Sequence, residues 1–84
     1  MRATEAAKAI MLKAGLTTTT LANKMSSQAK TYNARLVNDR LNQNDMTIGK
    51  LDEMVRTMGY KIVLVPDEPE VDKALKPYTT YRVF

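Results

Sequence analysis

The sequence predicts a mainly α-helical domain of four or five helices, followed by one or two C-terminal β-strands. Before Gly59, apolar side chains recur at helical spacing in four stretches. After Gly59, the segments YKIVLV (residues 60–65) and YTTYRVF (residues 78–84) are rich in β-branched and aromatic side chains. A chain of 84 residues is long enough for one small core. We therefore expect a helical body that ends in a strand, residues 1–65, and an acidic linker with a strand or arm, residues 66–84.

The composition is that of a globular chain without the common catalytic side chains. Hydrophobic residues make up 44% and charged residues 26% of the sequence, which argues against wholesale disorder. Cysteine and histidine are both absent, so the chain lacks disulfides, the usual zinc ligands, the commonest general base and the most reactive nucleophile. We expect a protein that is not an enzyme and that carries no cofactor and no metal.

The sequence has neither the apolar length of a membrane span nor the pattern of a secretory signal. The longest apolar runs, such as residues 62–65, are far too short to cross a bilayer. The first residues, MRATEAAKAIMLKAG, place a glutamate and two lysines among the apolar side chains, which is not typical of a signal peptide. We expect a cytoplasmic protein.

The first two helices are predicted from composition and capping. Residues 3–14 are rich in alanine, and Gly15 follows as the C′ residue that closes a helix in the left-handed conformation. Thr17 is the best N-cap for a second helix. The apolar stripe of this second helix has three members: Leu21, Ala22 and Met25.

A third helix is expected to begin near Ser27, after a tight polar turn. Tyr32 and Leu36 lie four residues apart and would hold this helix on the body. Polar and cationic side chains cover the rest of its surface: Lys30, Thr31, Asn33 and Arg35. Such a surface suits the major groove of DNA, where these groups pair with base edges and phosphates. The alternative is an ordinary helical hairpin with a solvated polar face.

The residues after Leu36 do not continue this pattern. In a regular helix, Val37 and Leu41 would project from the side opposite Tyr32 and Leu36, and an amphipathic surface helix does not have two apolar faces. We therefore expect a break or bend near Asn38. The alternative is one long helix whose second apolar face meets another subunit.

A fourth helix is expected to begin after Thr47, its N-cap, and to end before Gly59. Acidic side chains near its start and Arg56 near its end agree with the helix macrodipole. Its apolar stripe contains Ile48, Leu51, Met54, Val55 and Met58. The expected core of the domain consists of Leu21, Ala22, Tyr32, Leu36, Ile48, Leu51, Val55 and Met58.

The two C-terminal β-prone segments need a partner, because an isolated hairpin is marginal in water. Four antiparallel strands across a two-fold axis would remove the exposed edges, so we expect these strands to pair across a homodimer. Residues 66–72, PDEPEVD, are interpreted as an acidic linker punctuated by proline. The alternative for residues 66–84 is a loose tail.

Positive charge is concentrated in the half of the chain that carries the second and third helices. Residues 1–38 hold six basic side chains and one acidic side chain, a net charge of +5. Residues 39–84 hold seven basic and eight acidic side chains, a net charge of −1. Basic charge beside a candidate recognition helix is the electrostatic footprint expected of a DNA-binding protein.

Three segments in order, LANKM, SSQAKTYNARL and DMTIGKLDEMVRTMGYKIVLVP, resemble phage-type helix-turn-helix transcriptional regulators of the Cro and repressor (Xre-like) superfamily. The resemblance extends over roughly residues 16–66. It implies a transcriptional repressor of a prokaryotic or phage-infected cell, which binds double-stranded DNA at an inverted-repeat operator as a homodimer. The third helix of each subunit would enter the major groove. The chain departs from the family in two places: the usual turn glycine is either replaced by Ser26 or displaced, and about five residues within 37–43 are extra.

The resemblance assigns DNA contacts to the second and third helices. Gln28 or Asn33 would pair with adenine, and an arginine or lysine would reach guanine or a phosphate. Threonine hydroxyls at the start of the second helix would hold a phosphate. The expected DNA-binding residues are Thr18, Thr19, Lys24, Ser27, Gln28, Lys30, Thr31, Asn33 and Arg35.

Two other functions remain open. In the first, the chain is the antitoxin of a toxin–antitoxin pair, which binds DNA and clamps a toxin with residues 66–84. In the second, it is a phage-encoded protein inhibitor of a host defence enzyme, which keeps the fold but binds a protein. A tail that folds only on a partner would favour the antitoxin. Absence of salt-dependent DNA affinity would favour the inhibitor.

Overall fold

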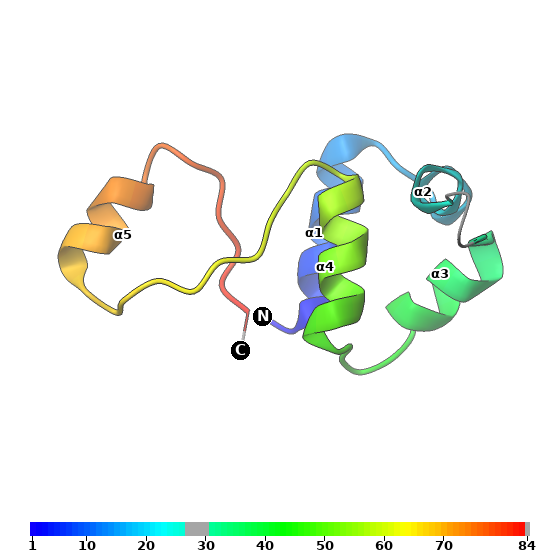
Figure 1. Ribbon diagram of the computed structural model, residues 1–84, viewed down its shortest axis with the longest axis horizontal. Coiled ribbons are helices and arrows are strands. Elements are labelled where there is room, and N and C mark those ends of the chain that lie inside the picture. The colour runs from blue at the N-terminus through cyan, green and yellow to red at the C-terminus, as the bar shows by residue number, and fades with distance from the viewer. Residues whose placement is uncertain (27–30, 84) are drawn as a thin grey trace.

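The computed structural model describes residues 1–26 and 31–83 of the chain. It contains five helices: α1 (Ala3–Ala14), α2 (Thr18–Met25), α3 (Ala34–Leu41), α4 (Ile48–Thr57) and α5 (Pro69–Leu75). Helices α1 to α4 form a body, and residues 60–83, here called the arm, leave α4, carry α5 at their far end and return to α1 (Figure 1). None of the described helices has the length and apolar character needed to cross a membrane.

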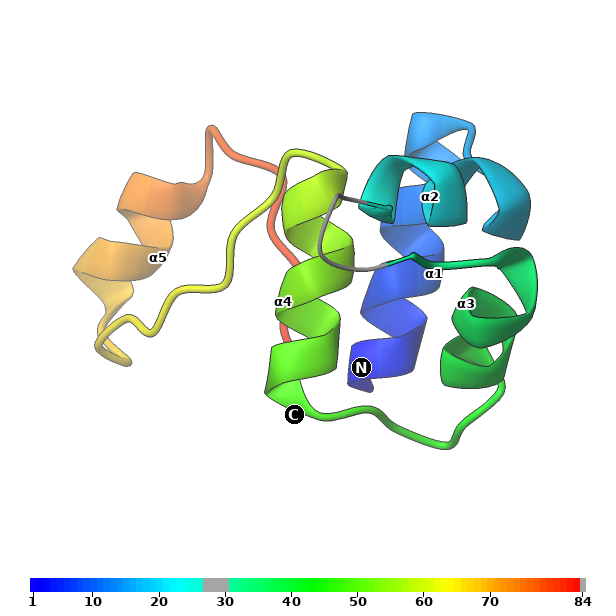
Figure 2. The same ribbon diagram turned by 45° about the vertical axis from the view of Figure 1, so that its right-hand side comes forward.

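The four helices of the body enclose a single core. Figures 1 and 2 place α1 and α4 side by side, with α2 and α3 on one side of this pair and the arm on the other. The most deeply buried side chains come from all four helices: Ala7, Leu21, Val37 and Met54. Leu51 and Val55 are buried beside them, as the stripe of the fourth helix predicts. Helical periodicity therefore positions the inner faces of α2 and α4 correctly.

Three helix ends match the capping residues expected from the sequence. The Thr17 hydroxyl accepts a hydrogen bond from the backbone N–H of Thr20, whose own hydroxyl accepts from the N–H of Thr17, so the two form a capping box. At α4 the Thr47 hydroxyl accepts a hydrogen bond from the N–H of Lys50, a one-sided N-cap. Gly15 closes α1 with φ of 69°, a left-handed conformation that favours glycine.

The expected start of the third helix is wrong. Helix α3 begins at Ala34, and the Asn33 side chain is its N-cap, since Oδ1 accepts a 2.9 Å hydrogen bond from the N–H of Leu36. This later start leaves Tyr32 outside the helix and changes which residues face the core. Val37 and Leu41 are buried, with 0% and 5% exposure, whereas Leu36 is 46% exposed.

The expected break near Asn38 is also wrong, because α3 runs without interruption to Leu41. The conflict between two apolar faces disappears once Tyr32 precedes the helix, since Val37 and Leu41 then form one inward stripe. At the fourth helix, Ile48 lies in the first turn and is 71% exposed, so its place in the expected core is wrong. Met58, just beyond α4, is partly buried against the core.

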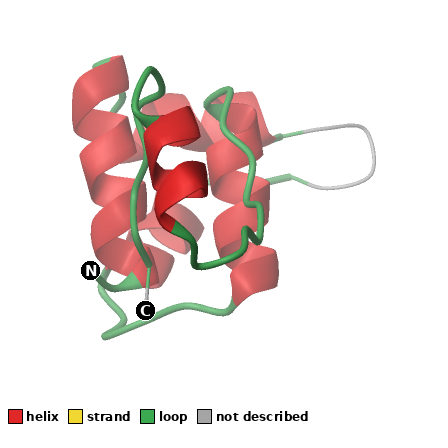
Figure 3. Cartoon of the chain, turned by 90° about the vertical axis from the view of Figure 1, so that its left-hand side faces the viewer, coloured by secondary structure: helices red, strands yellow, loops and turns green. Residues whose placement is uncertain are grey.

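The predicted C-terminal strands are not formed in the described chain, as Figure 3 shows. Residues 60–65 and 78–83 lack strand pairing, because β-branched composition alone does not supply a hydrogen-bonding edge. The predicted acidic linker instead leads into α5. Pro69 stands in the first turn, where its missing N–H costs nothing, and Glu70 and Asp72 follow in the same turn, where acidic side chains favour a helix start.

The arm is tied back to α1 by polar contacts. The α-ammonium group of Met1 donates a 3.1 Å hydrogen bond to the carbonyl oxygen of Arg82, so the returning limb of the arm passes beside the N-terminus (Figure 1). Lys13 Nζ donates to Thr79 Oγ1 over 2.9 Å. The rings of Tyr60 and Tyr81 meet edge to face with centroids 6.0 Å apart, joining the outgoing and returning limbs of the arm.

Candidate nucleic-acid interface

Helices α2 and α3 pack against each other, and residues 26–33 join them. The expected tight polar turn falls largely on residues 27–30, which lie outside the described residues. Ser26 closes the ends of this segment, because its Oγ accepts a 3.1 Å hydrogen bond from the N–H of Tyr32 and lies 3.0 Å from the carbonyl oxygen of Ala22. Ser26 thus joins the last turn of α2 to the residue that precedes the N-cap of α3.

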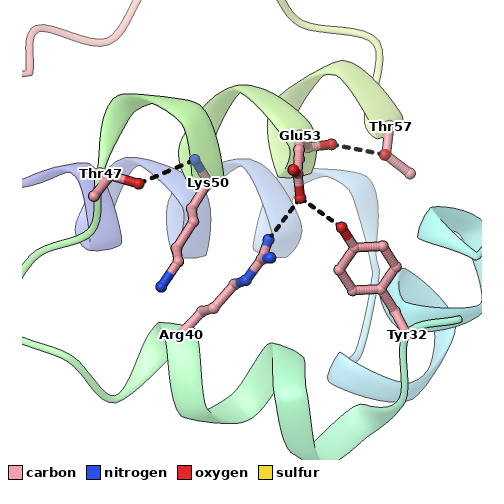
Figure 4. Close-up of polar contacts among 6 residues, drawn as sticks. All are labelled: Tyr32, Arg40, Thr47, Lys50, Glu53 and Thr57. Atoms are coloured by element: carbon pink, nitrogen blue, oxygen red, sulfur yellow. Dashed lines mark hydrogen bonds and ion pairs between the residues drawn. The ribbon is translucent and has the colours of Figure 1, made fainter. Parts of the chain in front are cut away.

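A three-residue cluster fixes α3 and its preceding segment to α4 (Figure 4). The Tyr32 hydroxyl donates a 2.6 Å hydrogen bond to Glu53 Oε2, and Arg40 Nη1 approaches the same oxygen at 3.2 Å. The Arg40 guanidinium also lies over the Tyr32 ring, 5.2 Å from its centroid. Because the Arg40 side chain is only 16% exposed and is paired with Glu53, it is a structural group rather than one offered to DNA.

The outward face of α3 differs from the one predicted. Val37 and Leu41 point inward, so the solvent side of the helix carries Arg35, Asn38 and Asp39. Arg35 is in the predicted set, but Asn38 and Asp39 are not. Placing the helix start at Ala34 instead of Ser27 brings these two side chains onto the outward face. The sequence shows that both side chains are polar, but it does not show that the helix begins at Ala34.

The other predicted DNA-binding residues occupy several settings. Thr18 is half-buried and Thr19 is exposed in the first turn of α2, and Lys24 is exposed in its last turn. Thr31 is exposed in the segment before α3. Asn33 is exposed as well, but its carbonyl oxygen already caps α3. The predictions for Ser27, Gln28 and Lys30 lie outside the described residues.

A second surface lies on the opposite side of the body, between the α1–α4 pair and the arm. It is a groove of about 300 Å³ with a largely apolar lining. The body supplies Ala6, Ile10, Leu51 and Val55, and the arm supplies Tyr60, Ile62 and Tyr81. Three further apolar side chains of its lining are well exposed: Ile48 at 71%, Val63 at 58% and Leu64 at 98%. A contiguous exposed apolar surface of this kind is typical of a protein–protein contact.

No protein-family model, no curated protein and no solved structure matches this chain. The likeness to phage-type regulators therefore depends on residues 21–25, 26–36 and 45–66 alone. Within residues 1–26 and 31–83, no group of three metal-ligating side chains is placed to hold an ion. The two surfaces of the described residues that bear on function are the α2–α3 surface and the apolar groove.

Proposed function

We propose that the protein is a sequence-specific DNA-binding transcriptional repressor in which α3 enters the major groove. The observation that carries this proposal is the division of α3 into two faces. Val37 and Leu41 are buried, while Arg35 and Asn38 are exposed on the outward face. Arginine pairs with the O6 and N7 atoms of guanine and asparagine with the N6 and N7 atoms of adenine, so this face offers both donors and acceptors to base edges.

Helix α2 contributes the contacts that position the protein on the DNA backbone. Its capping box uses the N–H groups of Thr17 and Thr20, leaving the N–H groups of Thr18 and Thr19 at the positive end of the helix dipole. No acidic side chain stands in that first turn. Lys24, at the other end of α2, supplies a charge that displaces counterions. These groups fix orientation without reading sequence.

The cluster of Tyr32, Arg40 and Glu53 supports base reading by α3, because a recognition helix must be held rigidly to discriminate between bases. Tyr32 lies just before the N-cap of α3 and Arg40 lies in its last turn, and both meet the same carboxylate oxygen of α4. The three groups thus fix the last turn of α3 and the residue before its N-cap on the body. This anchoring supports a helix used for recognition rather than a solvated hairpin.

We propose that the repressor acts as a homodimer on an inverted repeat, with the apolar groove covered by a second copy of this chain. Ile48 and Leu64 line the groove and are exposed. In a two-fold dimer, these side chains of each copy would fill the groove of the other copy. The lining of the groove comes from α1, α4 and the arm, and the arm lies on the side of the α1–α4 pair away from α3 (Figure 1). A contact there leaves both recognition helices free for half-sites about one helical turn apart.

A binding-site selection from random DNA duplexes tests this proposal. We expect enrichment of one palindromic sequence, because a two-fold dimer presents two identical helices. Affinity for the enriched duplex should fall steeply with added salt. Failure to enrich any sequence, with an affinity that does not respond to salt, would reject the repressor and favour the protein inhibitor.

A second candidate function is the antitoxin, and α5 is the observation that favours it. None of the 7 residues of α5 is buried, so this helix gains little from the body. A helix of this kind is suited to clamping a protein partner. Hydrogen exchange on the free dimer separates the two functions: fast exchange of the α5 amides favours a segment that awaits a toxin, and slow exchange favours a helix that is already part of the dimer.

A further inference from the structure

The outward face of α3 is centred on one acidic side chain, that of Asp39. Asp39 follows the buried Val37 by two residues and precedes the buried Leu41 by two. Because two residues of an α-helix correspond to a rotation of about 200°, the exposed Asp39 side chain projects directly away from the core. Arg35 and Asn38, which the proposed function assigns to base edges, are exposed on the same face. A partner that meets this face therefore also meets the Asp39 carboxylate.

The Asp39 carboxylate has no cationic partner in the described part of the chain. Arg35 stands one turn before it, but no ion pair joins the two side chains, and neither makes a side-chain hydrogen bond. In α4, by contrast, Asp52 comes four residues before Arg56, and their side chains pair over 2.8 Å. A pair at this spacing is favoured when the acid comes first, and α3 has the reverse order. Both charges of the outward face are therefore available to a partner.

These two charges have opposite effects on the approach of DNA. Arg35 attracts the polyanion and Asp39 repels it, so the two add no net charge to the outward face of α3. The exposed Lys24 on α2 supplies attraction that is independent of sequence. A carboxylate on the outward face opposes the binding of any duplex that does not offer it a hydrogen-bond donor. The base that supplies this donor is then required for tight binding.

Cytosine is the base that fits this carboxylate best. An ionised aspartate only accepts hydrogen bonds, so it is repelled by O6 and N7 of guanine and by O4 of thymine, which are acceptors as well. Adenine offers its N6 amino group, but the N7 acceptor of the same base lies beside it. Cytosine presents its N4 amino group in the major groove without an acceptor of its own.

We propose that Asp39 is a specificity-determining residue that accepts a hydrogen bond from the N4 amino group of one cytosine in each half-site. The proposal rests on the repressor function and adds to it a requirement for this base. Four residues of a helix advance about 6 Å and base pairs are stacked about 3.4 Å apart, so Arg35 and Asp39 reach different base pairs. A duplex without the cytosine meets an uncompensated carboxylate, and Asp39 therefore also lowers affinity for unrelated DNA.

The test compares Asp39→Asn with Glu70→Gln in the full-length protein. Each substitution replaces an exposed carboxylate on a helix by its amide, but Glu70 lies on α5, at the opposite end of the molecule from α3 (Figure 1). Selection from random duplexes identifies the sequence that each protein prefers. Fluorescence anisotropy then measures affinity for the wild-type sequence, for its single base-pair variants and for an unrelated duplex.

We expect replacement of the cytosine to weaken binding of the wild type about 5- to 150-fold. Asparagine pairs with adenine through N6 and N7, so Asp39→Asn should also accept adenine at this position. Its affinity for the unrelated duplex should rise about 2- to 5-fold, because a negative charge near the phosphates is removed. Glu70→Gln should keep the sequence and the affinities of the wild type.

A modified base tests the hydrogen bond itself. In N4-methylcytosine the methyl group takes the place of the amino hydrogen that faces the major groove, while the pairing with guanine is kept. At the cytosine whose preference changes in Asp39→Asn, this base should bind the wild type as weakly as a wrong base does. The same modification at a cytosine outside both half-sites should have no effect.

The outcomes separate this proposal from the repressor function. If the wild type and Asp39→Asn select the same sequence with the same preference at every base pair, Asp39 reads no base and the repressor function stands. An unchanged affinity of the wild type for N4-methylcytosine at the assigned position would also overturn the hydrogen bond. If the wild type enriches no duplex, the repressor function fails, and this proposal fails with it.

Discussion

The hydroxyl of Tyr32 donates a 2.6 Å hydrogen bond to Oε2 of Glu53, which joins the segment before α3 to the middle of α4. The two residues are 21 positions apart in the sequence. Arg40 reaches the same oxygen from the last turn of α3, so one carboxylate holds this turn and the residue before the N-cap of the helix. The orientation of the proposed recognition helix thus depends on a residue in a different helix.

The first prediction is that Glu53→Ala destabilises the protein by about 2 kcal/mol, because it removes the acceptor of Tyr32 and leaves Arg40 without its carboxylate. The Glu53 side chain is 40% exposed, so water offsets part of the loss. Asp52→Ala is the matched control, since Asp52 pairs with Arg56 on the exposed surface and its loss should cost about 0–0.5 kcal/mol. Urea unfolding measures both, and equal effects would mean that the cluster does not hold α3.

The second prediction distinguishes the two possible registers of α3. Leu41→Ala should cost about 2–4 kcal/mol because Leu41 is buried, whereas Leu36→Ala should cost less than about 1 kcal/mol because Leu36 is 46% exposed. Both variants remove the same atoms from the same helix, so each controls for the other. Denaturant unfolding gives the two values. If Leu36→Ala cost more stability than Leu41→Ala, a third helix that begins near Ser27 would be supported instead.

The third prediction concerns the homodimer. In sedimentation equilibrium the apparent mass should be near twice the 9.5 kDa of the chain. Leu64→Asp should shift it to the monomer value, because a charge at the groove opposes burial by a second copy. Leu12→Asp should leave the mass unchanged, since Leu12 is 84% exposed on α1 and does not line the groove. A Leu64→Asp variant that remains dimeric would place the contact elsewhere.

Local chemistry explains which parts of the fold were predictable. Thr17, Thr47 and Gly15 were identified correctly because a cap or a left-handed residue is recognised from its immediate neighbours. The spacing of apolar residues alone predicted the buried side chains of α4. Ile48 is the exception, because it lies in the first turn of the helix, where the core ends. These features depend on interactions within one helix or at its end.

The start of α3 was not predictable in this way, because the chain offers several capping side chains in succession. Ser26, Ser27 and Asn33 are all suitable N-caps by residue type. Tertiary bonds select Asn33: Ser26 holds Tyr32, and Tyr32 reaches Glu53, so Tyr32 is placed before the helix. The outward face of α3 changed with this start. Arg35 is exposed on this face, as predicted, and Asn38 and Asp39 are exposed there as well.

The arm was misinterpreted because two of its signals conflicted. The β-branched residues of 60–65 favour a strand, but a strand also needs an edge to pair with. Proline at 69 is typical of a linker, but proline followed by acidic residues is equally typical of the first turn of a helix. Helix α5 shows that the second interpretation was correct.

The most direct test of the central claim, that α3 reads base pairs, is the affinity of Arg35→Lys for the selected duplex and for its single base-pair variants. Lysine keeps the charge but not the planar fork that pairs with guanine. We predict a loss of about 1–3 kcal/mol on the selected duplex, an unchanged salt slope and a relaxed preference at one base pair of each half-site. If Arg35→Lys binds the selected duplex and all of its variants as the wild type does, α3 does not read DNA through Arg35, and the account is contradicted.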